Sequence, residues 1–420
     1  MSGGSSKTAD WQSLPRHGVG SDTRYENVAL AYETTPAVGL ATDGVGLAMT
    51  GDVGDGDARP LPHETTSSGT AIEQSARPRV PMPSKDTPAH NRRVTGELGL
   101  PQIIAARAVV DRYLPRAPLE RTPLLSAELG ADMYLKLETF KPTRTFKVRG
   151  ALNKIASLDQ GARARGVVAA SAGSHALGVA YAAAALGAKA VVVMPRGVSQ
   201  MIVAICRAYG AEVHLEGEVY DDTVALAHEI EHMERRAFIH PYADPLIIAG
   251  QGTIGLEILD DLPDAATVIV AVGGGGLIGG VSLALKSRRP EIRVIGVEPE
   301  GADAVGRSVA RGEPVELEHP RSVADKLVAK STDAMNIALV QRYVDEMVTV
   351  TDRALEAATL EYLERLSLLV EPSGGAPLAA LRSGATSARG KTVLVVSGGN
   401  VPAALLERII GDQLSLSAGR

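Results

Sequence analysis

Cysteine is almost missing from this chain of 420 residues, in which Cys206 is the only one. A single cysteine excludes an intramolecular disulfide and a metal site built from several thiolates. We expect the Cys206 side chain to be a small buried apolar group rather than a nucleophile. This cysteine usage fits a reducing, cytoplasmic setting.

Long apolar runs and a concentrated basic stripe are also missing. No apolar run approaches the roughly 20 residues of a membrane-spanning helix, and the N-terminus lacks the basic segment and apolar core of a signal peptide. The formal net charge of −6 argues against nucleic acid as the main partner. We therefore expect neither a membrane nor a nucleic-acid partner.

The first part of the chain lacks any sustained hydrophobic period. Residues 1–95 are rich in Gly, Ser, Thr, Asp, Ala and Pro. Such a composition cannot bury enough apolar surface to offset the chain entropy. We expect residues 1–95 to be a largely disordered extension and assign them no function.

From Leu98 onward, buried-type strands alternate with helices. Strands are expected over residues 122–125, 133–137, 167–171, 190–195, 212–215, 267–272, 293–297 and 392–396. Helices are expected over residues 101–110, 176–186, 199–209, 220–235, 352–366 and 376–381, and from Gly276 to about Ser287. This alternation predicts a mainly parallel sheet with helices on both faces.

Lys147 has the surroundings of a reactive lysine. It follows an aromatic residue, Phe146, and precedes Gly150 and an alanine-rich run, so we expect it near a helix start. Partial burial lowers the pKa of a lysine and favours the free amine. A free amine can form a Schiff base with an aldehyde, which makes pyridoxal phosphate the cofactor to look for. Taken alone, such a lysine is more often a solvated surface charge.

Four consecutive glycines give the strongest independent signal. Gly273, Gly274, Gly275 and Gly276 follow an expected strand and precede an expected helix. A loop of this kind exposes backbone N–H groups and leaves room for a phosphate. Its spacing departs from the common nucleotide-binding loops, so nucleotide binding is less favoured. The alternative is a flexible turn that packs a helix closely on a sheet.

Two other strand ends carry small hydroxyl groups. Ser397 follows its strand directly, and a neutral serine can bond a pyridine nitrogen without fixing a positive charge on it. The loop from Ser171 to His175 lies between a strand and a helix, where N–H groups and hydroxyls can hold a carboxylate. An ordinary turn at Ser397 and a helix cap at Ser174 are the simpler alternatives.

The chain from about Pro101 to Ile410 resembles the fold-type II pyridoxal-phosphate enzymes, in the branch of the threonine/serine dehydratases and serine racemases. Seven motifs in family order carry the resemblance: Phe146-Lys-Val-Arg-Gly-Ala-Leu-Asn153, Ser171-Ala-Gly-x-His-Ala, Ile248-Ala-Gly-Gln-Gly-Thr-Ile-Gly-Leu-Glu257, Gly273-Gly-Gly-Gly-Leu277, Val297-Glu-Pro299, Glu371-Pro-Ser-Gly-Gly-Ala376 and Ser397-Gly-Gly-Asn400. The resemblance implies an α/β fold of the tryptophan synthase beta type, with two doubly wound open-sheet domains and the cofactor between them. We expect residues 96–165 and 244–420 to form the large domain and residues 166–243 the small one.

The resemblance also implies a role for each motif. Lys147 is expected to be the catalytic Schiff-base lysine, with Phe146 packed against the cofactor ring. Gly273 to Gly276 and the N–H of Leu277 are expected to bind the phosphate, and Ser397 to meet the pyridine nitrogen. The candidates for substrate binding are Ser171, Ala172, Gly173, Ser174, His175, Arg144 and Lys326. Asn153, Glu371 and His175 are interpreted as residues that support the site.

Several residues around the expected site depart from the family pattern. Arg144-Thr145 replaces Gly-Ser before the lysine, and Ser174 replaces an asparagine that bonds the 3′-oxygen of the cofactor ring. Leu177 replaces a frequent glutamine, and Lys326 replaces the glycine of an Ala-Asp-Gly motif. Together these changes suggest a different substrate or impaired activity.

Two further positions separate the subfamilies. Ala172 stands where racemases carry a serine that handles the proton on the face opposite the lysine, which favours elimination over racemisation. Glu298 matches a glutamate of the racemases' divalent-cation site, but Ala304 replaces the aspartate and Asp303 is shifted by one residue. We therefore expect no bound metal.

The sequence thus predicts a pyridoxal-phosphate-dependent ammonia-lyase that converts a small amino acid to a 2-oxo acid and ammonia by α,β-elimination. We expect a homodimer or homotetramer. One alternative is elimination or replacement on a larger or acidic amino acid, because Arg144 and Lys326 are two extra cations that could hold a second carboxylate. Another is a protein that binds the cofactor without catalysing a reaction.

Overall fold

The computed structural model describes Met82 and residues 98–418, with side chains described as far as Asp412. All of these residues belong to one structural unit, Ala71–Arg420. The extension expected over residues 1–95 therefore lies, apart from Met82, outside the described residues.

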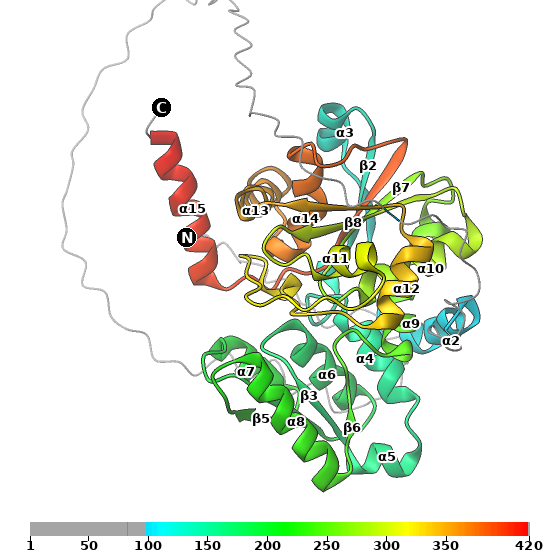
Figure 1. The fold of residues 1–420 in the computed structure, drawn as a ribbon, viewed down its shortest axis with the longest axis vertical. Helices are drawn as coiled ribbons and strands as arrows, with labels where there is room; N and C mark the ends of the chain where they lie inside the picture. Colours follow the sequence, from blue (N-terminus) through cyan, green and yellow to red (C-terminus); the bar gives the residue numbers. More distant parts are fainter. Residues whose placement is uncertain (1–81, 83–97, 419–420) are drawn as a thin grey trace, which may run out of the picture. The chain divides into compact units, whose positions relative to one another are not determined.

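Two open sheets organise the described residues (Figure 1). The first has six strands in the order β1 (Leu119–Arg121), β2 (Asp132–Leu137), β10 (Lys391–Val396), β7 (Thr267–Ala271), β8 (Arg293–Pro299) and β9 (Glu346–Val350). The second has four strands in the order β5 (Glu212–Leu215), β4 (Ala190–Met194), β3 (Val167–Ala170) and β6 (Ala237–Phe238). Every pairing is parallel except that of β1 with β2.

Helices cover both faces of each sheet, which is why the inner strands are continuous apolar runs. One face of the six-stranded sheet packs on α3 (Pro123–Leu129), α13 (Asp352–Leu366) and α14 (Pro372–Arg382), and the other on α9 (Pro245–Asp261), α10 (Gly276–Arg288), α11 (Ala304–Arg311) and α12 (Ala334–Tyr343). The four-stranded sheet packs on α4 (Lys147–Ala156), α6 (Ser174–Ala185) and α7 (Gln200–Ala208) on one face and on α8 (Tyr220–Glu234) on the other. The predicted α/β class, with helices on both faces of open sheets, is confirmed.

The remaining elements connect or flank these layers. They are α2 (Leu100–Tyr113), η2 (Glu138–Phe140), α5 (Gln160–Arg165), η3 (Asp325–Leu327) and α15 (Ala403–Ala418). Helix α2 packs along α9 and α4. The segment after η2 reaches the site described below, and η3 itself contributes residues to it.

One predicted strand is wrong. Residues 122–125 do not form a strand, because Thr122 precedes helix α3 and Pro123 occupies its first turn. Proline is well placed at that position, since the first N–H of a helix has no partner within the helix. The strand lies just upstream, as β1 over Leu119–Arg121.

Helix α9 packs closely against α4 and α10 at its glycines. It runs between α4 and α10, and its glycines allow backbone to approach backbone. A Cβ atom at Gly250 would lie 2.6 Å from the Cα of Gly150 in α4, and one at Gly255 would lie 2.8 Å from the carbonyl oxygen of Val281 in α10. This close packing fixes the two helices whose N-termini face the site.

Two expectations from composition concern the described residues. Cys206 is a free and buried thiol, and burial raises its pKa to about 12, so it is the inert apolar group that the sequence predicts. Among the residues that the structure describes, no helix is long and apolar enough to span a membrane.

Candidate active site

Lys147 is the first residue of α4 and lies beside the end of the last strand, β10. The segment before it pairs with the segment after β10: the N–H of Phe146 donates to the carbonyl of Ser397 at 3.1 Å, and the N–H of Gly399 donates to the carbonyl of Arg144 at 3.0 Å. Thr145 and Gly398 form an isolated antiparallel bridge between these bonds. The pairing joins distant parts of the sequence and places Lys147 at the carboxyl end of the sheet, where ligands of α/β folds bind.

Arg144 adopts a backbone conformation that favours glycine. Its φ is 55°, in the left-handed region. A non-glycine residue has a modest steric cost in that region. The guanidinium is directed to the carbonyl of Thr139, at 3.5 Å, and Arg144 is not among the residues that line the cavity.

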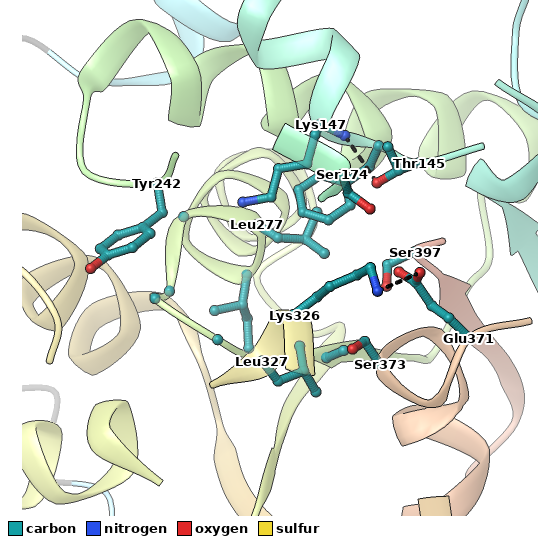
Figure 2. A pocket seen from close by; sticks show the side chains of 17 residues that line it. Thr145, Lys147, Ser174, Tyr242, Leu277, Lys326, Leu327, Glu371, Ser373 and Ser397 are labelled. Atoms are coloured by element: carbon teal, nitrogen blue, oxygen red, sulfur yellow. Dashed lines mark hydrogen bonds and ion pairs between the residues drawn. The ribbon is translucent and has the colours of Figure 1, made fainter. Parts of the chain in front are cut away.

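One cavity collects most of the predicted site residues (Figure 2). Its empty space, counted together with the solvent at its mouth, is about 500 Å³. It is lined by Thr145, Phe146, Lys147, Ser174, Tyr242, Ala271, Gly273, Gly274, Gly275, Gly276, Leu277, Ile278, Lys326, Leu327, Glu371, Ser373 and Ser397. The expected lysine, glycine loop and serine thus share one cavity.

The amine of Lys147 lies in the cavity and has a lowered pKa. Its Nζ donates to the carbonyl oxygen of Pro241 at 2.8 Å and lies 5.3 Å from the centre of the Phe146 ring. Burial lowers the pKa of Lys147 from 10.5 to about 8, because the charged form loses its hydration. A fraction of Lys147 is therefore a free amine, and thus a nucleophile and a base, near neutral pH.

The glycine loop has the geometry of an anion cradle. Gly275 has a φ of 92° and precedes α10, whose first residue is Gly276. The N–H groups of a first helical turn have no partner within the helix, and no side chain caps them here. Side chains would not fit: a Cβ at Gly274 would overlap the ring of Tyr242, and one at Gly276 would lie 2.6 Å from the carbonyl oxygen of Tyr242.

Lys326 is held in an ion pair inside the cavity. Its Nζ lies 3.4 Å from Oε2 of Glu371 and 2.9 Å from Oδ1 of Asp325. In Figure 2 it extends toward Glu371 and Ser397, while the amine of Lys147 points toward the side of Tyr242. Burial raises the pKa of Glu371 to about 7, and the nearby ammonium opposes that rise. The charge of Lys326 is thus already balanced by two carboxylates of the chain itself.

The loop from Ser171 to His175 reaches the cavity only through Ser174. The hydroxyl of Ser174 accepts a hydrogen bond from Nδ2 of Asn400 at 3.5 Å. Ser171, Ala172, Gly173 and His175 are not among the lining residues. Nε2 of His175 lies 2.8 Å from the carbonyl oxygen of Ile239, and burial lowers the pKa of His175 to about 3. These contacts fit the supporting role expected for His175.

Glu298, the possible metal ligand, is used inside the fold. Its two carboxylate oxygens accept the N–H groups of Val305 and Gly306, at 2.9 and 2.8 Å, at the start of α11. Burial raises the pKa of Glu298 to about 8. No group of three or more His, Cys, Asp or Glu side chains that could hold a metal ion occurs in the part of the chain that the structure describes.

Sequence reasoning did not identify Tyr242, Leu327 or Ser373 as lining residues. Tyr242 belongs to the segment between β6 and α9, and its ring lies against the glycine loop. Tyr242 follows the carboxyl end of β6, the side of an open α/β sheet where ligands bind, but the sequence did not predict this two-residue strand. Leu327 and Ser373 reach the cavity from η3 and α14. Ser373 lies inside the motif Glu371–Ala376 and Leu327 follows Lys326, but neither was assigned a role in the site.

The sequence pattern of a family described as "Pyridoxal-phosphate dependent enzyme" matches residues 110–398. The chain belongs to this family. An L-threonine ammonia-lyase of Thermotoga maritima is 42% identical to it over 321 residues, which cover 76% of this chain and 80% of that relative. The lysine, glycine loop and serine that share the cavity therefore belong to a pyridoxal-phosphate enzyme.

Solved structures agree on the fold. The processed form of threonine deaminase isoform 2 from Solanum lycopersicum is 32% identical and superimposes with a TM-score of 0.71, covering 76% of this chain and 96% of that one. Maize serine racemase is 32% identical, with a TM-score of 0.71, and the match covers 77% of this chain and 100% of that one. The resemblance to the fold-type II enzymes of the dehydratase and racemase branch is confirmed.

Proposed function

We propose that this protein is an ammonia-lyase for L-threonine and L-serine that works by α,β-elimination. The observation that carries the proposal is the amine of Lys147, whose pKa is lowered and which shares one cavity with the glycine loop and Ser397. The relatives named as L-threonine ammonia-lyase and threonine deaminase support the choice of substrate. Ala172, which has no group to exchange a proton, favours elimination over racemisation.

The cavity fits pyridoxal phosphate. Gly273 to Gly276 and the N–H of Leu277 would hold the phosphate at the N-terminus of α10, in a loop where side chains are excluded by packing. The hydroxyl of Ser397 would face the pyridine nitrogen, Phe146 would pack on the ring, and Ser174 would meet its substituents. Lys147 is the lining lysine whose pKa is lowered, and it would attach the cofactor.

The residues of the chain then carry the proton chemistry. When bound, pyridoxal phosphate supplies an aldehyde that takes up the substrate amine and a ring that stabilises negative charge at the α-carbon. Nζ of Lys147, as a free amine, removes the α-proton of the substrate. The β-hydroxyl takes up a proton and leaves as water, so the net loss from the substrate is the α-proton and the hydroxyl. The dehydrated amino acid then adds one water to give the 2-oxo acid and ammonia.

The contacts of Arg144 and Lys326 argue against a substrate that carries a second carboxylate. Lys326 is already paired with Asp325 and Glu371, and the guanidinium of Arg144 is directed to a carbonyl of η2. A second substrate carboxylate would have to displace one of the protein's own carboxylates from Lys326. We therefore propose a neutral side chain on the substrate.

A substrate panel with the purified protein tests the proposal. L-Threonine and L-serine should yield 2-oxo acid and ammonia, while threo-3-hydroxyaspartate should be turned over at least tenfold less efficiently. A preference for hydroxyaspartate would instead support the acidic-substrate alternative. A protein that shows the visible absorption of bound cofactor but turns over no amino acid would be the idle binding protein.

We propose further that residues 96–165 and 244–420 form the large domain and residues 166–243 the small one. The composition of the two sheets supports this division, since strands β3 to β6 all lie between residues 167 and 238. A homodimer or homotetramer in the cytoplasm is the proposed working form, and sedimentation of the purified protein would test the assembly.

A further inference from the structure

The carbonyl oxygen of Gly274, in the middle of the glycine loop, accepts hydrogen bonds from two side chains. Oγ1 of Thr332 donates to it at 3.0 Å and Nδ2 of Asn336 donates to it at 2.9 Å. Both donors are buried, with 5% of Thr332 and none of Asn336 exposed. Thr332 lies just before α12 and Asn336 lies in its first turn. Neither lines the cavity, so both contact the loop from the side away from it.

This pair of bonds fixes one peptide plane of the loop. In a trans peptide the C=O and the following N–H point in opposite directions. Because the Gly274 carbonyl is turned toward α12, the N–H of Gly275 is turned the other way, toward the cavity that the loop lines. That N–H is a donor for an anion.

Without these bonds the peptide would be free to turn over. Gly274 and Gly275 carry no side chains, and glycine populates positive and negative φ about equally well. A reversed peptide would direct a carbonyl oxygen into the cavity, where it would repel a phosphate. The side chains of Thr332 and Asn336 therefore decide whether the loop presents a donor or an acceptor to the cavity.

Asn336 keeps this position at a cost. Its other amide atom, Oδ1, is buried and has no hydrogen-bond partner among the described residues. A buried unpaired acceptor is destabilising, and such groups in native proteins are rare. An apolar side chain would avoid that cost, which indicates that the donor on Nδ2 has a use beyond packing.

We propose that Thr332 and Asn336 are positioning residues for the cofactor phosphate, because they hold the Gly274 carbonyl so that the loop offers N–H groups to the anion. The inference rests on membership of the pyridoxal-phosphate family and does not depend on which amino acid is the substrate. Its specific consequence is selectivity for a phosphorylated over an unphosphorylated form of the same cofactor.

The test compares the binding of pyridoxal phosphate and of pyridoxal to the full-length apoprotein by absorbance titration. Thr332→Val and Asn336→Leu remove the donor groups and keep similar side-chain shapes. Each should therefore lower the affinity for pyridoxal phosphate about five- to tenfold. The affinity for pyridoxal, which lacks the phosphate, should change less than twofold. Thr332→Ser keeps the hydroxyl and should behave as the parent protein.

A matched control is Asn153→Leu, because Asn153 is also a largely buried asparagine whose Nδ2 holds a main-chain carbonyl, that of Leu246 at 2.7 Å. It should shift both affinities by the same factor. The proposal would be overturned if Thr332→Val and Asn336→Leu lowered the affinities for pyridoxal phosphate and pyridoxal by the same factor, or changed neither affinity. Thermal melts of the apoproteins identify a variant that fails to fold, and in that case the milder Thr332→Val variant decides the question. Since no turnover is measured, failure here is distinct from failure of the proposed reaction.

Discussion

The amine of Lys147 donates a hydrogen bond to the main-chain carbonyl of Pro241, with 2.8 Å between the two atoms. This bond connects the first turn of α4 to the segment between β6 and α9 that also carries Tyr242. A carbonyl accepts from the neutral amine as well as from the ammonium, so it orients Nζ without fixing its charge. Charge and orientation of Lys147 are therefore set by separate features, burial and Pro241.

Uptake of the cofactor should follow the pKa of Lys147. Only the free amine attacks an aldehyde, so the rate at which the apoprotein captures pyridoxal phosphate should rise as pH is raised and level off above about 8. With a lysine of the ordinary pKa of 10.5, the rate of cofactor capture would still increase well above that pH. Stopped-flow absorbance measures this rate, and Lys147→Ala should show no covalent capture after borohydride reduction. A rate independent of pH across the neutral and mildly alkaline range would contradict the lowered pKa.

Lys326→Met should make the stability of the protein more sensitive to pH. The pKa of Glu371 is about 7 in the folded protein and 4.5 without its surroundings. A carboxyl group with a raised folded pKa contributes stability below its unfolded pKa that is lost as pH rises through its folded pKa. Without Lys326 the folded pKa should rise further, so the loss should be larger and extend to higher pH.

The measurement for Lys326→Met is the free energy of unfolding in urea at about pH 5 and about pH 8, on either side of the Glu371 titration. The difference between the two pH values should be larger in this variant than in the parent protein. In the double variant Lys326→Met/Glu371→Gln, the difference in unfolding free energy between the two pH values should be equal to or smaller than that of the parent protein. Unchanged pH dependence would mean that Lys326 and Glu371 do not interact in solution.

Gly274→Ala should weaken cofactor binding because the new Cβ overlaps the ring of Tyr242. We expect a loss of at least tenfold in affinity for pyridoxal phosphate, measured by absorbance titration. Tyr242→Ala in the same chain makes room for the methyl group, so the double variant should bind more tightly than Gly274→Ala alone. If Tyr242→Ala lowers the affinity for pyridoxal phosphate further, the overlap of the new Cβ with the Tyr242 ring is not the cause of the weaker binding.

Arg149→Met should strongly destabilise the fold. Arg149 is fully buried and forms paired bonds to Glu138 and Glu257, at 2.7 to 2.9 Å. Removing it leaves buried carboxylates short of a partner, which costs about 3–5 kcal/mol. The matched control is Arg121→Met, which removes an exposed arginine paired with Asp132 and should leave the unfolding curve unchanged. Chemical denaturation of both variants compares a buried with an exposed ion pair, and equal effects would refute the distinction.

Much of the site was predictable because each of its main parts follows a strand. Lys147, Gly273 and Ser397 lie close behind β2, β7 and β10, which are neighbours in one sheet. Parallel strands end at the same edge, so residues that follow them converge even when they are far apart in sequence. Strand and glycine patterns marked the glycine loop and Ser397, while the preceding aromatic residue and the helix start marked Lys147.

The other residues of the site could not be predicted from local sequence patterns, because only tertiary packing brings them together. Thr332 and Asn336 act on the glycine loop from far downstream in the sequence, and only the tertiary contacts reveal the bonds. Helix α9 was not predicted because its glycines interrupt the apolar period, although they are what lets it approach α4 and α10. The sequence suggested that Lys326 was a free cation, because its partner Glu371 is distant in the chain.

The sheet order also determines when the site can exist during synthesis of the chain. Strand β10, the last strand of the described residues, lies between β2 and β7 rather than at an edge. Until residues 391–397 have left the ribosome, β2 has no parallel neighbour and the cavity lacks the wall that carries Ser397. A nascent chain can therefore present Lys147 and the glycine loop well before it can join them in a single cofactor site.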